Sequence, residues 1–471
     1  MNSWMEILIG LRVEMVLTVT LFVLLAMFLA GKGTQGKMVI GIAMAGLLVT
    51  LVVGFTMQQP AQLFGFMFRS DNLIRLQKNI LALGSLLVMA QSYPWLVKHR
   101  HGLEYCLLLI SALLGMFFMV SSGHLLMFYL GLELSTIPIA AMANFDLDKR
   151  CSSEAAFKMI VSSALASGVL LMGISYLYAA NGTLEYAALS QAITASPLQV
   201  LALVLVAAGF GFKISAVPFH LWTADVYEGA PLPTTAFLSV ISKGAVLFVL
   251  VTALYQVFAP LSGYWYSMVA VLACATMLTG NLFAMRQQNF KRFMAFSSIA
   301  QVGYMLVGIS GQGAEGHASL VYFVLVYVFS NLAAFGVLAL ISQQYQRECI
   351  YDFRGFYKTH PGLAWALAIA LFSLAGVPPM AGFFGKFFLI LAGASQLQWW
   401  LVVVAALNMV ISMYYYLRVV RLMFMDEAEE PLTPLPKMNW SPKLALVVCL
   451  AGILLTGLLS GAYRYIFSLV Q

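Results

Sequence analysis

Long apolar runs separated by short polar segments dominate this chain. A helix needs roughly 20 predominantly apolar residues to cross a bilayer, and on that measure we predict about fourteen spans. Their approximate centres are residues 18, 46, 88, 112, 132, 168, 210, 245, 273, 300, 330, 377, 410 and 454. Because the connections are short, nearly all of the mass is predicted to lie in the membrane. The fold class is therefore an all-α polytopic membrane protein.

Composition and charge refine this picture. Of the 471 residues, 62% are hydrophobic and 9% are charged, which excludes an average soluble domain. Lys and Arg in short loops are retained on the cytoplasmic side. With the N-terminus outside, fifteen of the 25 basic residues, including Lys32 and Lys437, fall in cytoplasmic loops, and five, including Lys78, fall on the outer side. Both termini are thus predicted outside, and the net charge of +7 gives little reason to expect a nucleic-acid partner.

Two apolar runs are interrupted by proline. In 203–222, Lys213 and Pro218 fall mid-span, and in 371–390, Pro378 and Pro379 precede Lys386. Proline breaks a helix, and lipid tolerates the freed carbonyls only where they meet protein or water. Because the two breaks lie five spans apart with Lys and Pro in opposite order, the pattern predicts two inverted five-helix repeats, each with a broken helix.

These repeats divide the chain into four parts. We predict a three-helix group over 1–100, a first repeat over 101–257 (helices 4–8), a second over 258–430 (helices 9–13) and a final helix over 431–471. The acidic linker 426–431, with Pro434 and Pro436 beyond it, is expected to be a solvated loop.

Four lysines lie in runs so apolar that we expect them to be embedded in lipid: Lys158, Lys213, Lys243 and Lys386. An ammonium near the bilayer centre costs at least ~2.5 to 3.5 kcal/mol on insertion scales. Each must therefore face the bundle interior, a wet cavity or an acidic partner. A chain of such groups is what a proton path requires.

Other polar groups accompany these lysines. Glu133 is a lone carboxylate, either a protonated packing group or the partner of a lysine, and we favour the second. Glu154 lies four residues before Lys158, the favourable order for a helical ion pair that either orients its helix or takes part in transport. His220 suits a helix cap or a proton relay equally. Gln301 can hold water but cannot titrate.

No cofactor site is expected in this chain. The five cysteines form no CxxC pair, and no histidine stands at metal-ligand spacing, so disulfides, metal sites and iron-sulfur sites are not predicted. Gly209 and Gly211 are followed by Phe212 and Lys213, which do not complete a dinucleotide-binding loop.

Several motifs resemble one family. Residues 217–231 read Val-Pro-Phe-His-Leu-Trp-Thr-Ala-Asp-Val-Tyr-Glu-Gly-Ala-Pro, supported by Gly-Leu-Glu-Leu at 131–134, Lys-Arg-Phe-Met-Ala-Phe-Ser-Ser-Ile at 291–299 and Ser-Leu-Ala-Gly-Val-Pro-Pro at 373–379. They resemble the antiporter-like subunits of the bacterial proton-pumping NADH:quinone oxidoreductase, respiratory complex I. The form of the first motif, and lysine at 386, look like the N-type subunit. The resemblance covers essentially the whole chain.

The resemblance implies a membrane-arm subunit that translocates protons when quinone reduction elsewhere in the complex drives it. It places the proton-carrying residues at Glu133, Lys213, Lys243 and Lys386, with Lys158 accessory. FMN, iron-sulfur clusters and quinone are expected in partner subunits, and neighbouring antiporter-like and small membrane subunits are the expected partners. The location would be the bacterial inner membrane, with both termini periplasmic. Relatives often have histidine where this chain has Gln301, so a water would have to replace that ring.

The residues alone leave other functions open. The same fold serves multisubunit cation/proton antiporters and membrane-bound hydrogenases. A stand-alone solute transporter should have a midplane cavity with selective polar groups, whereas this chain has single titratable residues spaced helix by helix. A purely structural scaffold would leave the lysines unexplained.

Overall fold

The structure is a computed structural model that describes residues 4–31, 36–56, 60–311, 313–395, 399–427, 438–459 and 461–471. The helices of its first half are α1 (Trp4–Gly10), α2 (Arg12–Leu29), α3 (Gly36–Phe55), α4 (Asn72–Lys98), α5 (Gly102–Val120), α6 (Leu125–Ala143), α7 (Arg150–Asn181), α8 (Tyr186–Ala192), α9 (Pro197–Ile214), α10 (Leu221–Gly229), α11 (Leu232–Phe237) and α12 (Lys243–Thr252). Those of the second half are α13 (Ser262–Arg286), α14 (Phe290–Ile309), α15 (Gly313–Tyr345), α16 (Phe356–Thr359), α17 (Pro361–Ala375), α18 (Ala381–Ala394), α19 (Trp399–Phe424), α20 (Trp440–Leu458) and α21 (Gly461–Val470).

Shorter elements complete the fold. The π-helical turns η2 (Leu238–Ser242) and η3 (Ala253–Val257) flank α12, and the 3₁₀ turns η4 (Ala259–Leu261) and η5 (Ile350–Phe353) precede α13 and α16. Strands β1 (Ala61–Leu63) and β2 (Phe68–Ser70) pair antiparallel, with Ala61 opposite Ser70.

All fourteen predicted span centres fall on this framework. Within the described part of the chain, 13 helical runs are long and apolar enough to cross a membrane. The remaining centre, residue 377, lies between the shorter apolar helices α17 and α18. The prediction of a polytopic all-α membrane protein is confirmed.

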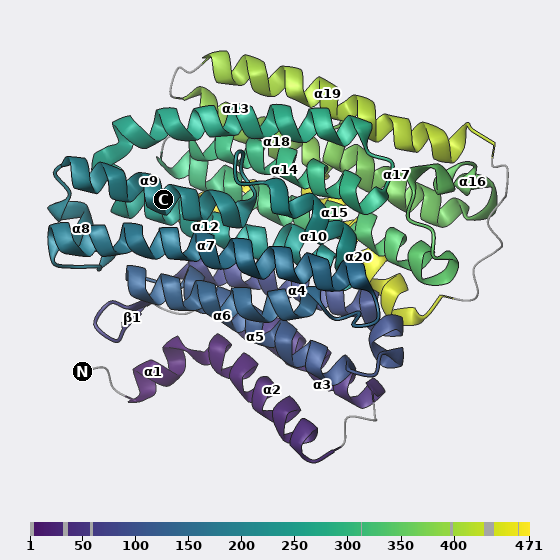
Figure 1. Ribbon diagram of the computed structural model, residues 1–471, viewed down its shortest axis with the longest axis horizontal. Helices are drawn as coiled ribbons and strands as arrows, with labels where there is room; N and C mark the ends of the chain where they lie inside the picture. The colour runs from purple at the N-terminus through teal and green to yellow at the C-terminus, as the bar shows by residue number, and fades with distance from the viewer. Residues whose placement is uncertain are drawn as a thin grey trace.

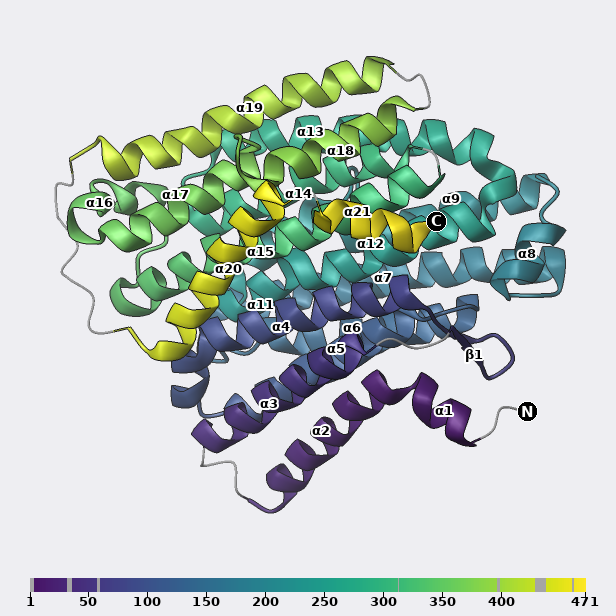
Figure 2. The same cartoon turned by 180° about the vertical axis from the view of Figure 1, so that it is seen from behind.

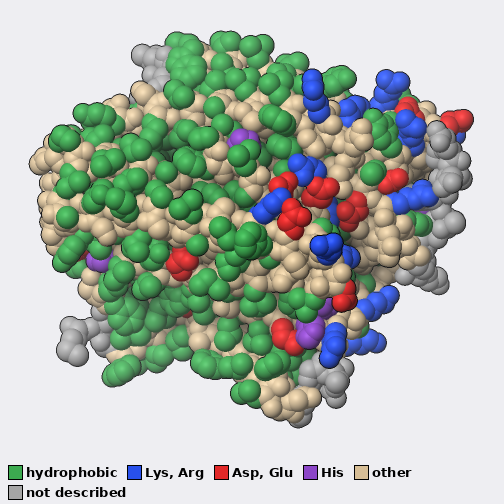
Figure 3. Space-filling view, viewed as in Figure 1, with side chains coloured by type: hydrophobic (Ala, Val, Ile, Leu, Met, Phe, Trp, Pro, Cys, Tyr) green, Lys and Arg blue, Asp and Glu red, His purple; other side chains and the backbone are tan. Residues whose placement is uncertain are grey.

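The spans lie side by side along a common direction, and both termini lie toward the end of the bundle that carries β1 (Figures 1 and 2). Helix α14, helix α15 and the run Leu232–Val257 are almost wholly buried, whereas α2, α3, α7, α19 and α20 leave most of their surface outward. Figure 3 shows Lys and Arg side chains gathered at the end of the bundle opposite the N-terminus. We call this the basic end.

Close helix packing depends on small residues. A Cβ on Gly280 of α13 would lie 2.5 Å from the Ala300 nitrogen of α14, and one on Gly209 of α9 would lie 2.6 Å from the Leu170 Cβ of α7. Glycine at these positions therefore lets the backbones approach closely, as at many helix contacts in membranes.

Both predicted helix breaks are present. Helix α9 ends at Ile214 with Ser215 at φ 64°, and helix α17 ends at Ala375 with Gly376 at φ 87°. The positive φ turns the chain out of the helix, as a C-terminal cap does. Pro218 lies in the first interruption and Pro378 and Pro379 in the second.

Three expectations need comment. Lys78 does not lie in an outer loop, because α4 begins at Asn72 and carries this side chain into the bundle, where it is 1% exposed. Lys32, Lys437 and most of the acidic linker lie outside the described residues. Of that linker, Glu427 accepts a hydrogen bond from Lys358 at 2.8 Å, which lowers the pKa of the Glu427 carboxyl.

Candidate functional site

Lys213 stands in the last turn of α9, directly before the first break. Its Nζ donates to Thr136 Oγ1 of α6 at 2.8 Å and to Ser163 Oγ of α7 at 2.7 Å. Lys213 is partly buried, whereas Lys243 and Lys386 are buried. Two neutral hydroxyls, contributed by two other spans, thus hold this ammonium.

Glu133 lies on α6 and accepts a hydrogen bond from Ser167 Oγ of α7 at 2.5 Å. It forms no ion pair with Lys213 among the contacts of the described residues. Instead Ser163 and Ser167, one helical turn apart on α7, contact Lys213 and Glu133 respectively. The carboxylate and the ammonium are therefore held by two different serines of the same helix, one turn apart.

Lys243 begins α12, directly after the π-helical turn η2. Turns of this kind often mark functional sites. The side chain is 2% exposed, its Nζ donates to Ser298 Oγ of α14 at 2.8 Å, and it lies 5.3 Å from the centroid of the Tyr227 ring. The ring face and the hydroxyl together accommodate the cation, and no carboxylate among the described residues pairs with it.

Lys386 lies in the second turn of α18, just after the second break, and is fully buried. Its Nζ donates to the freed carbonyl of Ala375 at 3.2 Å and to Ser412 Oγ of α19 at 3.4 Å. The Tyr304 ring lies 4.6 Å from the ammonium. The broken helix therefore supplies an acceptor to the lysine beside it.

Gln301 is fully buried on α14. Its Nε2 donates to the freed carbonyl of Leu374 at 3.0 Å and to Tyr416 Oη at 3.2 Å, while its Oε1 has no hydrogen-bond partner within the part of the chain that the structure describes. The sequence suggested a water at this position, and it did not identify Tyr416. The run of three tyrosines at 414–416 was an available signal, because tyrosine hydroxyls inside an apolar span require hydrogen-bond partners.

Lys158 differs from the expectation of a lipid-embedded lysine. Its side chain is 40% exposed, and its Nζ lies 2.7 Å from Glu154 and 2.7 Å from Asp225 of α10. Arg292 of α14 joins this network, 2.9 Å from Asp225 and 2.7 Å from Glu228. The i, i+4 pairing with Glu154 was predicted, whereas the tertiary partners were not.

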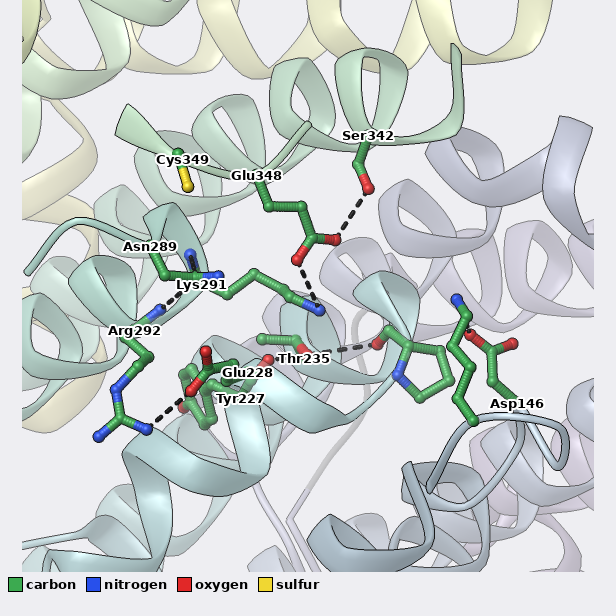
Figure 4. A network of polar contacts seen from close by, with 12 residues as sticks. Asp146, Tyr227, Glu228, Thr235, Asn289, Lys291, Arg292, Ser342, Glu348 and Cys349 are labelled. Atoms are coloured by element: carbon green, nitrogen blue, oxygen red, sulfur yellow. Dashed lines mark hydrogen bonds and ion pairs between the residues drawn. The ribbon is translucent and has the colours of Figure 1, made fainter. Parts of the chain in front are cut away.

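The half-helix α10 is held by this network, and it carries Tyr227 beneath Lys243. Figure 4 shows Arg292 directed toward Glu228, and Glu348 between Lys291 and Ser342. Lys291 Nζ lies 3.2 Å from Glu348. Two cavities, of about 520 and 380 Å³, share Glu348 in their walls. Charged groups and open volume therefore meet at the basic end of the site.

His220 precedes α10 at its N-cap position but makes no capping hydrogen bond. Its buried Nδ1 has no partner within the described contacts. Of the two expected roles, the structure gives no support to the cap.

A buried ion pair that the sequence did not predict joins α4 to α2. Lys78 of α4 contacts Glu14 of α2, and both side chains are at most 3% exposed. The Phe68 ring lies 4.9 Å from the Lys78 ammonium. The available signal was a lysine and a glutamate near the ends of two apolar runs. Residues in adjoining loops would give the same pattern.

Comparison with known proteins gives consistent results. The family described as NADH:quinone oxidoreductase/Mrp antiporter, TM, matches residues 122–412. The chain is 45% identical over 420 residues to NADH-quinone oxidoreductase subunit N of Phocaeicola vulgatus, covering 86% of this chain and 87% of that protein. It is 37% identical to subunit N of Rhodospirillum rubrum, covering 92% and 91%.

Solved structures show the same fold. A chain of respiratory complex I from Thermus thermophilus superposes with a TM-score of 0.82 at 30% identity, covering 95% of this chain and 97% of that one. A chain of the Mrp complex from Dietzia sp. gives a TM-score of 0.86 at 20% identity, covering 99% and 97%. The second likeness is one of fold alone.

Proposed function

Since this chain belongs to the NADH:quinone oxidoreductase/Mrp antiporter transmembrane family, we propose that it is a membrane-arm subunit of NADH:quinone oxidoreductase, respiratory complex I. In this role it translocates protons across the membrane, driven by quinone reduction elsewhere in the complex. One observation carries the proposal: spans far apart in sequence each bring an ammonium inward and hold it by hydroxyls and freed carbonyls.

The proposed proton-carrying residues are Glu133, Lys213, Lys243 and Lys386. Lysine is suited to this work because burial favours its neutral form while nearby polar groups favour the charged one. Hydroxyl partners stabilise an ammonium without fixing it as a permanent ion pair. Each lysine can then hold and release a proton.

Protons would enter at the basic end, near the cavities that share Glu348, and reach Lys243. Lateral exchange toward Lys386 and release at the opposite end would complete the path. Lys158, Glu154, His220 and Gln301 are proposed as accessory groups. The parts 101–257 and 258–430, with helix breaks at Pro218 and at Pro378 and Pro379, are proposed as the two inverted repeats.

The proposal has consequences for partners and location. FMN, iron-sulfur clusters and quinone would be bound by other subunits, since no redox chemistry is proposed for this chain. The chain would lie in a bacterial inner membrane, with the basic end cytoplasmic and both termini periplasmic. Subunit N relatives at up to 46% identity favour complex I over the Mrp alternative, which the structural likeness supports by fold alone.

The test removes the buried ammonium of Lys386 by Lys386→Ala. NADH-driven proton pumping, measured in inverted vesicles at equal amounts of assembled complex, should fall by a factor on the order of 10². The matched control is Lys358→Ala, because Lys358 is an exposed lysine at 64%. Wild-type pumping by an assembled Lys386→Ala complex would contradict the proposal.

A further inference from the structure

Two hydroxyl-bearing residues of α19 lie between Lys243 and Lys386. Ser412 and Tyr416 are one helical turn apart, so they share a face of α19, and both are fully buried. Neither is accounted for by the path proposed so far, in which Gln301 would need a water to relay protons. Their contacts are with groups that also contact the two lysines.

Tyr416 meets the Lys243 side of the bundle. Its Oη forms a hydrogen bond with Ser297 Oγ of α14. The next residue, Ser298, accepts the hydrogen bond from Lys243 at 2.8 Å. Both serines are fully buried, so consecutive residues of α14 contact Lys243 and Tyr416.

Ser412 meets the Lys386 side. Its Oγ accepts a hydrogen bond from Lys386 Nζ at 3.4 Å. The Tyr304 ring lies 4.6 Å from the same ammonium. The groups thus fall in the order Lys243, Ser298, Ser297, Tyr416, Ser412 and Lys386. Among the described contacts no hydrogen bond joins Ser298 to Ser297 or Tyr416 to Ser412, so each of these two steps requires a bridging water.

We propose that Tyr416 and Ser412 are further proton-carrying residues, forming an α19 relay between Lys243 and Lys386. The inference rests on the proposed function. Each hydroxyl accepts a proton on its oxygen while passing its own proton to the next group, directly where the two are hydrogen-bonded and through a bridging water at the steps from Ser298 to Ser297 and from Tyr416 to Ser412. Lys243 is left as a neutral amine and Lys386 becomes an ammonium, so the relay itself gains and loses nothing. Rotation of the hydroxyls then restores the starting orientation.

Gln301 supports this relay without carrying the proton. An amide donates hydrogen bonds through its nitrogen and accepts them through its oxygen. A hydroxyl oxygen can do both, and an amide has no single atom that can. Its Nε2 holds Tyr416 Oη at 3.2 Å, which fixes the phenol beside Ser297. Its buried Oε1 is an acceptor of the kind that ordered water satisfies.

A rival route through α15 is less complete. Ser239 donates to Asn331 Oδ1 at 2.9 Å, and Asn331 donates to Tyr327 Oη at 2.8 Å. Among the described contacts, none of these three residues bonds to Lys386 or to Ser412. Of the two routes, the one through α19 is therefore the one with a hydroxyl, that of Ser412, bonded to Lys386.

The test uses Tyr416→Phe in the whole complex, since this change removes one hydroxyl and leaves the ring. The matched control is Tyr105→Phe: Tyr105 of α5 is also fully buried, and its hydroxyl bonds Thr234 Oγ1 at 3.2 Å, a contact outside the relay. We expect Tyr416→Phe to lower NADH-driven pumping by about tenfold or more and Tyr105→Phe to lower it by less than about twofold. Equal pumping by the two variants would overturn the relay.

Ser412 supplies the independent arm, which also serves if Tyr416→Phe impairs assembly. Ser412→Ala should lose pumping, and Ser412→Thr, which keeps the hydroxyl, should restore it. Full pumping by Ser412→Ala would overturn the relay. Lys386→Ala in the same assay separates the two ideas: if it abolishes pumping while both hydroxyl variants pump normally, the relay is wrong and the proposed function stands.

Discussion

At the scale of single residues, the site stabilises charge with hydroxyls rather than with carboxylates. Lys213, Lys243 and Lys386 each contact Ser or Thr. A carboxylate partner would hold each ammonium more strongly, and breaking a buried ion pair costs about 3 to 5 kcal/mol. Neutral partners keep the two protonation states closer in free energy, which suits a group that must release its proton.

The Ser167 hydroxyl, which donates to Glu133, gives a test at this scale. Ser167→Ala removes the hydrogen bond to Glu133, and a hydrogen bond to a charged group contributes roughly 1.5 to 3 kcal/mol. We expect NADH-driven pumping to fall roughly tenfold, since about 1.4 kcal/mol corresponds to that factor. Ser153→Ala on the same helix is the control, because Ser153 is exposed and bonds Asn144. An equal effect of the two substitutions would refute a role for this hydrogen bond.

The sequence revealed these lysines but not their partners. The lysines could be predicted because a charged side chain in lipid is energetically costly. The prolines predicted the helix breaks beside Lys213 and Lys386. Thr136 and Ser163 lie 77 and 50 positions from Lys213, and nothing local in the sequence aligns their helices with α9. Such pairings depend on how distant helices pack.

At the scale of elements, the broken helices and the N-terminal helices are fastened by different means. Freed groups at the second break are met by side chains: Leu374 by Gln301, Ala375 by Lys386, and the Gly382 nitrogen by Ser373. Helix α2 is instead joined to α4 by the buried pair of Glu14 and Lys78. The length of the apolar runs predicted the spans. It did not predict the pair of Glu14 and Lys78, because charged residues near the end of an apolar run fit a loop equally well.

That pair makes a prediction about assembly. Lys78→Met leaves the Glu14 carboxylate buried without its cation, which should destabilise the packing of α2 by about 3 to 5 kcal/mol. Glu14→Leu combined with Lys78→Met removes both charges and should be close to neutral. The measurement is the thermal stability of the purified complex. Equal destabilisation by the single and double variants would argue against a buried pair.

At the scale of the whole molecule, the orientation follows from the distribution of basic residues. Cys151 and Cys349 are exposed and line or adjoin the cavities of the basic end. A membrane-impermeant maleimide should label them in inside-out vesicles and not in right-side-out ones. A cysteine introduced by Gln471→Cys should show the opposite pattern. Reversal of both patterns would invert the proposed topology.

Lys243 tests most directly whether buried lysines carry the protons, because it is 2% exposed and, among the described residues, its ammonium bonds one hydroxyl, that of Ser298. Lys243→Met keeps the length of the side chain and removes the ammonium. The measurement is NADH-driven proton pumping by the assembled complex in inverted vesicles. We predict a loss on the order of 10², and pumping at the wild-type rate would contradict the account.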